Sequence, residues 1–302
     1  MKKNQLYNLR RTYSDKIFDI SNIVIMVVLL FVFVWPLWFV LIASFSNPMA
    51  VAKGEVLFLP KDITVSGYQL MLEYKSLWTG YANTIFYSAV GTLLNLILSV
   101  CCAYPLATKD FYPRKVITYL LMFTMYFSGG MIPLYLVVKK VGLLDTWWAM
   151  IIPNAISFYN CLVVRSYMMN SIPGELKEAS TLDGANSAQY LWKVVLPLSK
   201  PVLAVVGLYY LVGHWNNYRS ALLYIYDEAK YPLQSVLRNL LSSVNYISTG
   251  DVTDPEELEM VYRQSQQMKY CVIIAAAVPM LCVYPFIQKF FVKGVMVGSV
   301  KG

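Results

Sequence analysis

Long apolar runs alternate with shorter polar segments along most of the chain. A transmembrane helix needs about 20 mostly apolar residues, because it rises ~1.5 Å per residue through a hydrocarbon core ~30 Å thick. Six runs reach this length, some of them marginally: Ile20–Ser44, a segment within Tyr81–Thr108, Val116–Val138, Trp147–Val164, Pro201–Tyr218 and Tyr270–Ile287. The pattern therefore predicts an all-α integral membrane protein with six transmembrane helices.

The composition agrees with a membrane protein. Of the 302 residues, 58% are hydrophobic and 14% are charged, whereas soluble domains carry about 25% charged residues. The net charge of +8 raises the question of nucleic acid, but the basic residues flank apolar runs, as membrane orientation signals do. The five cysteines form no CxxC pair and have no histidine nearby. We therefore expect no nucleic-acid partner, no disulfide and no metal site.

The first apolar run follows a basic N-terminal segment, which is also the pattern of a cleaved signal peptide. Its uncharged stretch Ile23–Ala43 has 21 residues, however, and signal-peptide cores typically have about 7–15. We therefore interpret it as a retained signal anchor.

The distribution of Lys and Arg predicts the orientation. With the N-terminus inside, the cytoplasmic segments hold 15 basic and 6 acidic residues, and the outer segments hold 10 and 11. By the positive-inside rule, both termini are expected in the cytoplasm. The predicted organisation is a cytoplasmic N-terminus (1–19), a six-span domain (20–292) and a cytoplasmic tail (293–302). Within the domain, 170–200 is an inner loop, and 45–80 and 220–269 are outer loops.

The polar inner segment Glu175–Pro201 predicts a helix, a turn and a second helix. Glutamates in the first turns suit the helix dipole, and Asp183–Gly184 should end the first helix, since glycine readily adopts the left-handed conformation. Asn186 or Ser187 can cap the second helix, which the prolines near its end should terminate or kink. The pattern fits a docking surface for another protein and equally a hairpin that only connects two spans.

The letters EAS, DGA and WKVVLPLSKP in this segment resemble the cytoplasmic EAA loop of permease subunits of binding-protein-dependent ABC importers. Seven positions match, and Ser180 stands where the family has alanine. The matching residues are Glu178, Ala179, Asp183, Gly184, Ala185, Leu196 and Pro197. Three further segments, SGGMIPLYLVVKKVGLLDT, GHWNNYRSALLY and YPLQSVLRNLL, are similar to carbohydrate permeases of the maltose type, especially those for oligosaccharides and polysaccharide fragments.

The resemblance implies a type I ABC importer permease fold with a cytoplasmic coupling helix that seats in a groove of an ATPase subunit. Glu178 would face basic groups there, Ala179 and Leu182 would fill the groove, and Gly184 would allow the turn. The implied partners are a second homologous permease, two ATPase subunits, an extracytoplasmic solute-binding protein and an oligosaccharide. ATP and Mg would bind the ATPase, since this chain has no G-x-x-x-x-G-K-[ST] sequence. The implied location is the bacterial plasma (inner) membrane, where the chain is a non-catalytic multi-pass subunit.

Polar residues inside the spans are candidates for a substrate path. A sugar has many hydroxyls and few charges, so its path requires amide, hydroxyl and aromatic side chains. The candidates are Asn83, Asn95, Asn154, His214, Trp215, Asn216 and Asn217. Hydrogen bonding between helices is the alternative role for Asn95 and Asn154. In the outer loop 220–269, the region Tyr246–Glu259 is the expected contact with the binding protein.

Three other functions remain as alternatives. A permease for amino acids or peptides would share the EAA loop, although the long outer loops and the HWNNY segment favour sugar. An ion-coupled secondary transporter would need ionisable groups at mid-membrane, which the predicted spans lack. A membrane enzyme using Glu178 and Asp183 would lack a nucleophile or metal set.

Overall fold

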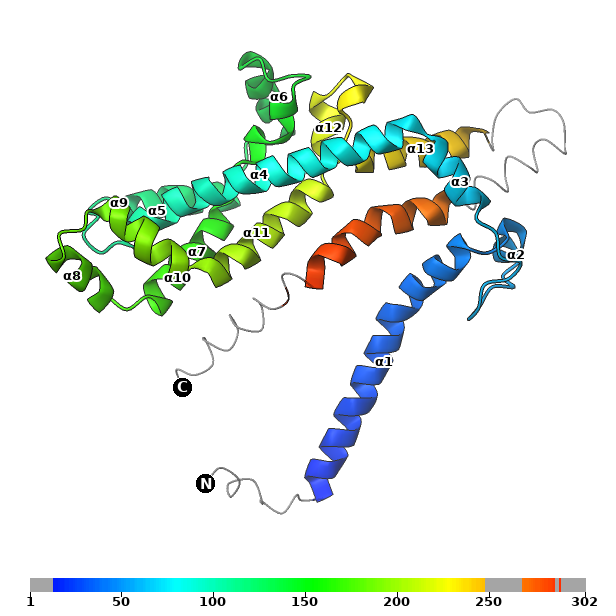
Figure 1. Ribbon diagram of the computed structural model, residues 1–302, viewed down its shortest axis with the longest axis horizontal. Helices are drawn as coiled ribbons and strands as arrows, with labels where there is room; N and C mark the ends of the chain where they lie inside the picture. Colours follow the sequence, from blue (N-terminus) through cyan, green and yellow to red (C-terminus); the bar gives the residue numbers. More distant parts are fainter. Residues whose placement is uncertain (1–12, 248–267, 286–287, 289–302) are drawn as a thin grey trace. The chain divides into compact units, whose positions relative to one another are not determined.

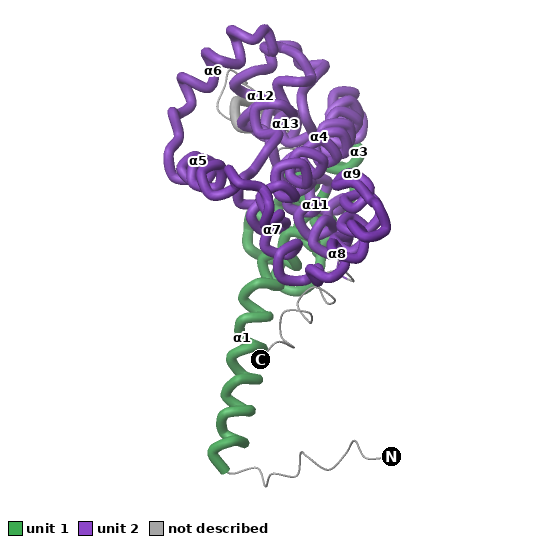
Figure 2. The backbone as a smooth tube through the Cα atoms, turned by 90° about the vertical axis from the view of Figure 1, so that its left-hand side faces the viewer, with its two compact units in different colours: residues 1–71, 244–274 green, residues 72–243, 275–302 purple. Residues whose placement is uncertain are grey.

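The computed structural model describes residues 13–247, 268–285 and 288, and every regular element among them is a helix. The chain forms two compact units, coloured separately in Figure 2. Unit 1 comprises Met1–Met71 and Val244–Ile274, and unit 2 comprises Leu72–Ser243 and Ala275–Gly302. Residues 1–12 of the predicted N-terminal segment 1–19 and the whole predicted tail 293–302 lie outside the described residues, as does 248–259 of the expected binding-protein contact.

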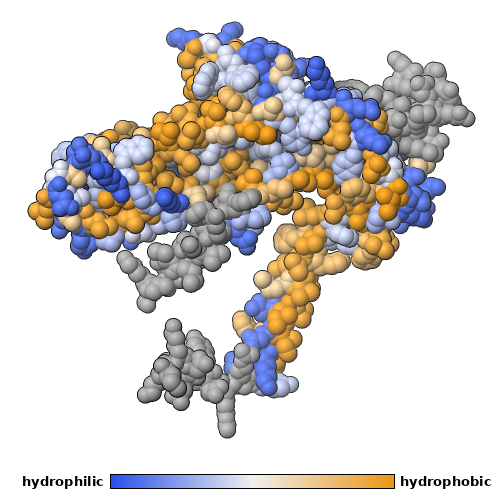
Figure 3. Space-filling model, viewed as in Figure 1, coloured by the Kyte–Doolittle hydropathy of each residue, from blue (hydrophilic) through white to orange (hydrophobic). Residues whose placement is uncertain are grey.

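Unit 1 is dominated by α1 (Tyr13–Ser44), a helix of 32 residues. Its most apolar window has a mean hydropathy of 2.9, and none of that window is buried. Apolar side chains cover its surface in Figure 3. An exposed apolar surface of this length is typical of a helix surrounded by lipid. The short helices α2 (Pro48–Ala52) and α3 (Ser66–Glu73) follow it.

Unit 2 is built on three helices that pack together: α4 (Lys75–Ala107), α7 (Phe158–Ser171) and α11 (Lys200–Trp215). Figure 1 shows α4 and α11 running along one another. Their buried core is Val100, Ala103, Val164, Met168, Tyr190, Val195, Val202, Val206 and Tyr210. This core holds the elements that carry the candidate site.

Three of the expected spans are bent pairs of helical segments. α5 (Arg114–Tyr126) and α6 (Met131–Lys140) meet at 114°, so the run Val116–Val138 is not one straight rod. The break falls at the Ser-Gly-Gly sequence, where Gly130 has φ +90°, a conformation that few other residues adopt. The 3₁₀ turns η1 (Trp147–Met150) and η2 (Ile152–Asn154) meet α7 at 54°.

The third bent pair joins the predicted inner segment to the fifth expected span. α9 (Ser187–Tyr190), the π-helical turn η3 (Leu191–Val195) and α10 (Leu196–Leu198) form one arm, which meets α11 at 78°. The bend falls between the two prolines, as the sequence predicts, because proline cannot donate the helical hydrogen bond. Among the described residues, three single helices, α1, α4 and Met268–Pro285, are long and apolar enough to cross a membrane. Up to six spans result there if each bent pair is one span.

The predicted outer loops are more helical than the sequence pattern indicates. The range 45–80 contains α2, α3 and the first turns of α4, which begins at Lys75. The range 220–269 contains most of α12 (Arg219–Tyr224), η4 (Glu228–Lys230) and α13 (Leu233–Ile247). α13 buries Leu233, Val236, Leu237 and Leu240, the spacing of an amphipathic helix. Such a helix was overlooked because too few apolar residues follow one another to form a span.

Candidate functional site

A cavity of about 510 Å³ opens between α4, α7 and α11. It is lined by Asn95, Asn154, Ser157, Asn160, Tyr209, Tyr210, Gly213, His214, Asn216, Asn217, Tyr218 and Arg219. Amide, hydroxyl and aromatic groups therefore dominate its wall. In the part of the chain that the structure describes, no three His, Cys, Asp or Glu side chains converge as metal ligands. The chemistry of this wall is hydrogen bonding and stacking.

One hydrogen-bonded pair in this wall joins α4 to α11. The Asn95 Oδ1 atom lies 3.2 Å from His214 Nε2, and Asn95 Nδ2 donates to the Asn154 carbonyl at 3.1 Å. Because an amide oxygen only accepts, this contact assigns the imidazole proton to Nε2. Both Asn95 and His214 are buried. Their side chains therefore hold helices together, the alternative role that the sequence left open for Asn95.

A second pair lies one helical turn further along both helices. Ser99 Oγ and Tyr210 Oη are 2.8 Å apart, and Tyr210 Oη also accepts the Ser157 backbone N–H at 3.2 Å. Residues four apart lie on one helix face, so the pairs form a continuous polar seam between α4 and α11. We call these four residues, Asn95, Ser99, Tyr210 and His214, the polar seam.

The close approach of the helices at the seam depends on Gly91. A Cβ atom at this position would lie 2.5 Å from His214 Nε2. Contacts between real Cβ atoms and their neighbours are essentially never that short, so the imidazole would have to move. The glycine thus allows His214 to reach Asn95.

The structure brings five of the seven predicted path residues to the cavity and leaves two elsewhere. Asn95, Asn154, His214, Asn216 and Asn217 line it. Asn83 instead donates to the carbonyls of Ala229 and Tyr231, at 2.8 and 3.0 Å. Trp215 is 5% exposed and donates from Nε1 to the Ala276 carbonyl at 3.1 Å. These two side chains are engaged in packing, so their placement differs from the sequence expectation.

Among the lining residues that the sequence reasoning missed are Asn160, Tyr209 and Arg219. Asn160 lies in α7 and could have been found by the rule that selected Asn154, since it is an amide inside an apolar run. Tyr209 and Arg219 carry no such signal. A tyrosine in a span is usually an interface or packing residue, and Arg219 only marked the end of the fifth apolar run.

At the other end of unit 2, α8 (Glu175–Leu182) is a short surface helix without a buried residue. It ends as predicted, with Gly184 at φ +76°. Asn186 then caps α9, since its Oδ1 accepts the Gln189 N–H while Gln189 Oε1 accepts the Asn186 N–H, both at 2.9 Å. The predicted helix, turn and second helix are therefore confirmed as local structure.

The predicted coupling residues fall into two groups. Exposed or half-buried positions on α8 and its turn hold Glu178, Ala179, Ser180, Leu182, Asp183, Gly184 and Ala185. Leu196 and Pro197 lie apart from them, in α10. The side chain of Leu182 is 89% exposed. A groove of about 720 Å³ runs beside α8, and both Glu178 and Leu182 line it.

A salt bridge links α8 to the segment that follows α4. The Lys177 ammonium pairs with the Asp110 carboxylate; the Asp110 side chain is largely exposed and that of Lys177 is half-buried. The hydrogen bond from Lys177 lowers the pKa of Asp110. This contact ties α8 to the segment that follows α4, at one end of the helix bundle.

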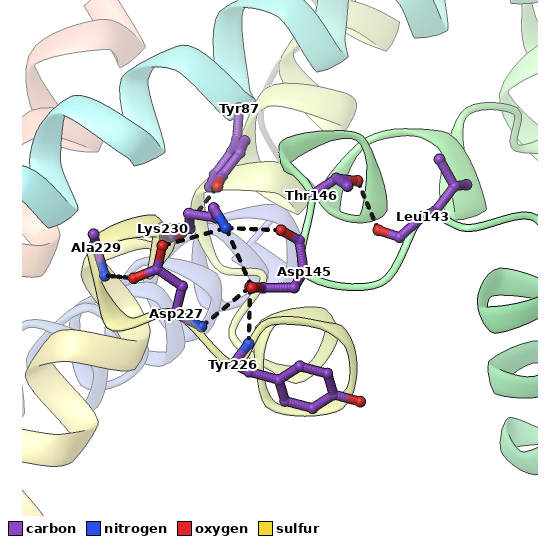
Figure 4. A network of polar contacts seen from close by, with 8 residues as sticks. All are labelled: Tyr87, Leu143, Asp145, Thr146, Tyr226, Asp227, Ala229 and Lys230. Atoms are coloured by element: carbon purple, nitrogen blue, oxygen red, sulfur yellow. Dashed lines mark hydrogen bonds and ion pairs between the residues drawn. The ribbon is translucent and has the colours of Figure 1, made fainter.

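A network of charged and backbone groups, which we call the Asp145 clamp, joins three segments of unit 2 (Figure 4). Asp145 Oδ1 accepts the N–H groups of Tyr226 and Asp227, both at 3.1 Å. Lys230 Nζ donates to the Asp145 carbonyl at 2.9 Å and pairs with both carboxylates at 3.2–3.3 Å. Tyr87 donates to the Lys230 carbonyl at 2.8 Å. The clamp therefore fixes the connection between α12 and α13 onto α4.

The contacts of the Asp145 clamp also change the pKa of the Asp145 carboxyl. The backbone N–H of Asp227 lowers the pKa of the Asp145 carboxyl, and the N–H of Tyr226 and the Lys230 ammonium act in the same direction. The sequence offered no signal for this network, because Asp145 lies 81 to 85 residues before its partners Tyr226, Asp227 and Lys230.

This chain is similar in sequence to known proteins. Protein LplC of Bacillus subtilis is 37% identical over 298 residues, which is 99% of either chain. The polygalacturonan/rhamnogalacturonan transport system permease protein YtcP of the same organism is 36% identical, covering 96% of this chain and 100% of its own.

A solved structure is also similar. It is described as a bacterial ABC transporter involved in the import of the acidic polysaccharide alginate, and its chain is 35% identical with a TM-score of 0.83. The alignment covers 93% of this chain and 98% of that one. Residues 2–297 match the family described as binding-protein-dependent transport system inner membrane component. With that match along nearly its whole length, this chain belongs to the binding-protein-dependent transport system inner membrane components.

Proposed function

We propose that this chain forms half of the translocation path of an ATP-driven importer for a carbohydrate, specifically an oligosaccharide. The observation that carries the proposal is the 510 Å³ cavity, whose wall presents amides, hydroxyls and tyrosines. Such groups match the hydroxyls and apolar faces of sugars. Similar permeases carry names that specify arabinooligosaccharides and polygalacturonan/rhamnogalacturonan. A peptide or amino acid permease is less well supported by these relatives.

The energy source in this proposal is a partner ATPase, with ATP and Mg bound to that partner. α8 acts as the coupling helix: Leu182 and Ala179 enter a groove of the ATPase, and Glu178 pairs with a basic group. The support is the exposure of Leu182 and the lack of any buried residue in α8, since an exposed apolar side chain on a short surface helix gains stability when a partner covers it. The chain itself acts as a permease subunit.

In the membrane, the chain adopts a type I importer permease fold with six spans. α1, α4 and Met268–Pro285 are the single spans, and the three bent pairs are the others. Both termini lie in the cytoplasm, an orientation supported by the Lys and Arg bias. α8 is then cytoplasmic, and the Asp145 clamp lies on the outer side.

The remaining partners complete the path. A second homologous permease supplies the other half, two ATPase subunits bind the coupling helices, and an extracytoplasmic solute-binding protein delivers the oligosaccharide to the outer side. The helices α12 and α13 form part of the surface available to the binding protein. Their fixed placement by the Asp145 clamp supports this role.

The test is reconstitution of this chain in proteoliposomes with the permease, ATPase and binding protein encoded beside it. We expect an oligosaccharide to be taken up only when ATP and the ATPase are present, and to stimulate ATP hydrolysis. Uptake driven by an ion gradient without the ATPase would contradict the proposal. Stimulation by peptides or amino acids, with none by carbohydrates, would contradict the assignment of the solute.

A further inference from the structure

One cation stands out in the wall of the cavity. Arg219, the first residue of α12, lines it together with uncharged polar and aromatic groups. No Asp or Glu is among the lining residues. The imidazole of His214 is engaged with Asn95. Among the lining residues that the structure describes, there is therefore a single guanidinium and no carboxylate to balance it.

No carboxylate in the described part of the chain neutralises the charge of Arg219. Within the ranges 13–247, 268–285 and 288, the salt bridges join other residues, and none includes Arg219. A second arginine, Arg238 on α13, lies with its Cζ atom 5.8 Å from the ring centre of Tyr218. Tyr218 itself lines the cavity. Positive charge thus gathers at the end of the cavity formed by residues 216–219.

An amide in the cavity wall can form hydrogen bonds that the described part of the chain does not use. Asn160 lines the cavity and is only 7% exposed, yet no hydrogen bond joins its amide to any part of the chain that the structure describes. Its amide atoms are not among the buried polar atoms that lack a partner, so they are open to the cavity and can bond a ligand or water. Tyr209 is 48% exposed and adds an aromatic ring to the lining of the same cavity.

We propose that the cavity takes a sugar residue that carries a carboxylate, and that Arg219 binds this carboxylate while Asn160 binds a sugar hydroxyl. The inference rests on the proposed function and names its substrate class. A guanidinium holds a carboxylate through two parallel hydrogen bonds, which are stronger than bonds between neutral groups. A neutral sugar would leave the cation without a partner. Arg219 is therefore the residue that selects an acidic sugar over its neutral counterpart.

The experiment measures binding to the complete transporter in nanodiscs of neutral lipid. The binding protein is omitted, so that its own selectivity does not enter, and the lipid excludes anionic headgroups as competitors. The probes are trigalacturonate and its methyl ester, in which each carboxylate is replaced by an uncharged ester that carries one added methyl group. Saturation-transfer NMR gives the Kd of each. We expect the acid to bind at least about tenfold more tightly than the ester, the usual effect of a charge-assisted pair.

Three variants test whether Arg219 causes the preference for the acid over the ester. Arg219→Gln should weaken binding of the acid to the level of the ester and leave the ester unchanged. Arg219→Lys should keep part of the preference, since it retains the charge without the two-pronged geometry. Arg238→Gln is the matched control, because it removes an equal charge nearby from a residue that does not line the cavity, and it should preserve most of the preference. Each variant is compared at equal amounts of assembled transporter.

Two results would overturn the inference. Equal binding of acid and ester by the unchanged protein would remove the preference itself, and full preference in Arg219→Gln would remove the role of Arg219. In either case, uptake of a neutral oligosaccharide in the reconstitution experiment would leave the proposed function intact. Failure of all carbohydrates in both experiments would overturn the two proposals together.

Discussion

Within unit 2, the polar seam between α4 and α11 and the surface of α8 differ in the burial of their side chains and in whether those side chains have partners. In the seam, Asn95 and His214 are buried and each is satisfied by a named partner. On α8, no residue is buried, and Leu182 is left 89% exposed. The seam gains its stability from contacts inside this chain, whereas α8 holds an apolar side chain that gains nothing until something covers it.

The difference separates residues that build the subunit from residues that are free to act on other molecules. A change in the seam should alter the stability of the protein first and transport as a consequence. A change on α8 should leave stability unaltered and alter transport directly. The predictions that follow use this contrast, beginning with the largest expected effect.

The largest effect is expected for Gly184→Val. At φ +76° a β-branched residue is strained even though a Cβ would meet nothing within 4 Å. The turn after α8 should therefore change shape, and solute-stimulated ATP hydrolysis by the reconstituted transporter should be nearly abolished while the protein still inserts. Gly174→Ala is the control, because its Cβ also meets nothing and its φ is not positive. Normal stimulation by Gly184→Val would contradict the role of the turn.

Within the seam, Gly91→Ala should destabilise the protein by about 1–3 kcal/mol, the usual cost of overpacking. The added methyl group would lie 2.5 Å from His214 Nε2 and displace the imidazole from Asn95. Gly207→Ala is the matched control on α11, where the nearest atom, Leu96 Cδ1, is at 3.4 Å. Thermal unfolding in detergent should show a lower midpoint for Gly91→Ala only. Equal midpoints would mean that the helices do not need this close approach.

On α8, Leu182→Ala should leave the unfolding midpoint unchanged, since exposed side chains contribute within about 0.5 kcal/mol. Its affinity for the ATPase should fall by about tenfold, because covering a leucine is worth about 1.5–3 kcal/mol. Co-purification or surface binding with the isolated ATPase measures this affinity. An unaltered affinity, or a loss of stability, would show that Leu182 belongs with the structural residues.

The smallest effect is expected at the Asp145 clamp. Because folding lowers the pKa of Asp145, its carboxylate contributes stability that is present above the unfolded pKa of about 3.9 and is lost as the pH falls through the lower folded value. Asp145→Asn removes this ionisation. The unfolding midpoint of the unchanged protein should therefore decline more steeply on acidification below pH about 4 than that of the variant. Parallel declines would exclude the clamp as the source.

The contrast between the two regions also explains what the sequence could predict. The helix, turn and cap at Glu175–Gln189 depend on neighbouring residues such as Gly184 and Asn186, so local rules found them. The apolar runs predicted α1 and α4 because length and hydropathy are local as well. The prolines marked where one of the bent pairs turns, but its angle of 78° and the angle of 114° between α5 and α6 depend on packing.

Contacts between residues that are far apart in the chain could not be predicted from the sequence. Asn95 and His214 are 119 residues apart, and nothing near either residue indicates that they meet. Asn83 and Trp215 looked like path residues because they are polar or aromatic at the ends of spans, yet both are engaged by backbone carbonyls. Arg219 escaped because a charge at the end of an apolar run is ordinarily a boundary signal. The type of residue was informative at these positions, but its partner decided its role.

The central claim, that α8 contacts the ATPase on the cytoplasmic side, is tested most directly by site-specific photo-crosslinking in the assembled transporter. A photoreactive amino acid replaces Leu182 in one variant and Tyr226, an exposed residue beside the Asp145 clamp, in the other. We predict a crosslink to the ATPase from position 182 and none from position 226. A crosslink to the ATPase from position 226, or to the extracytoplasmic binding protein from position 182, would contradict this account.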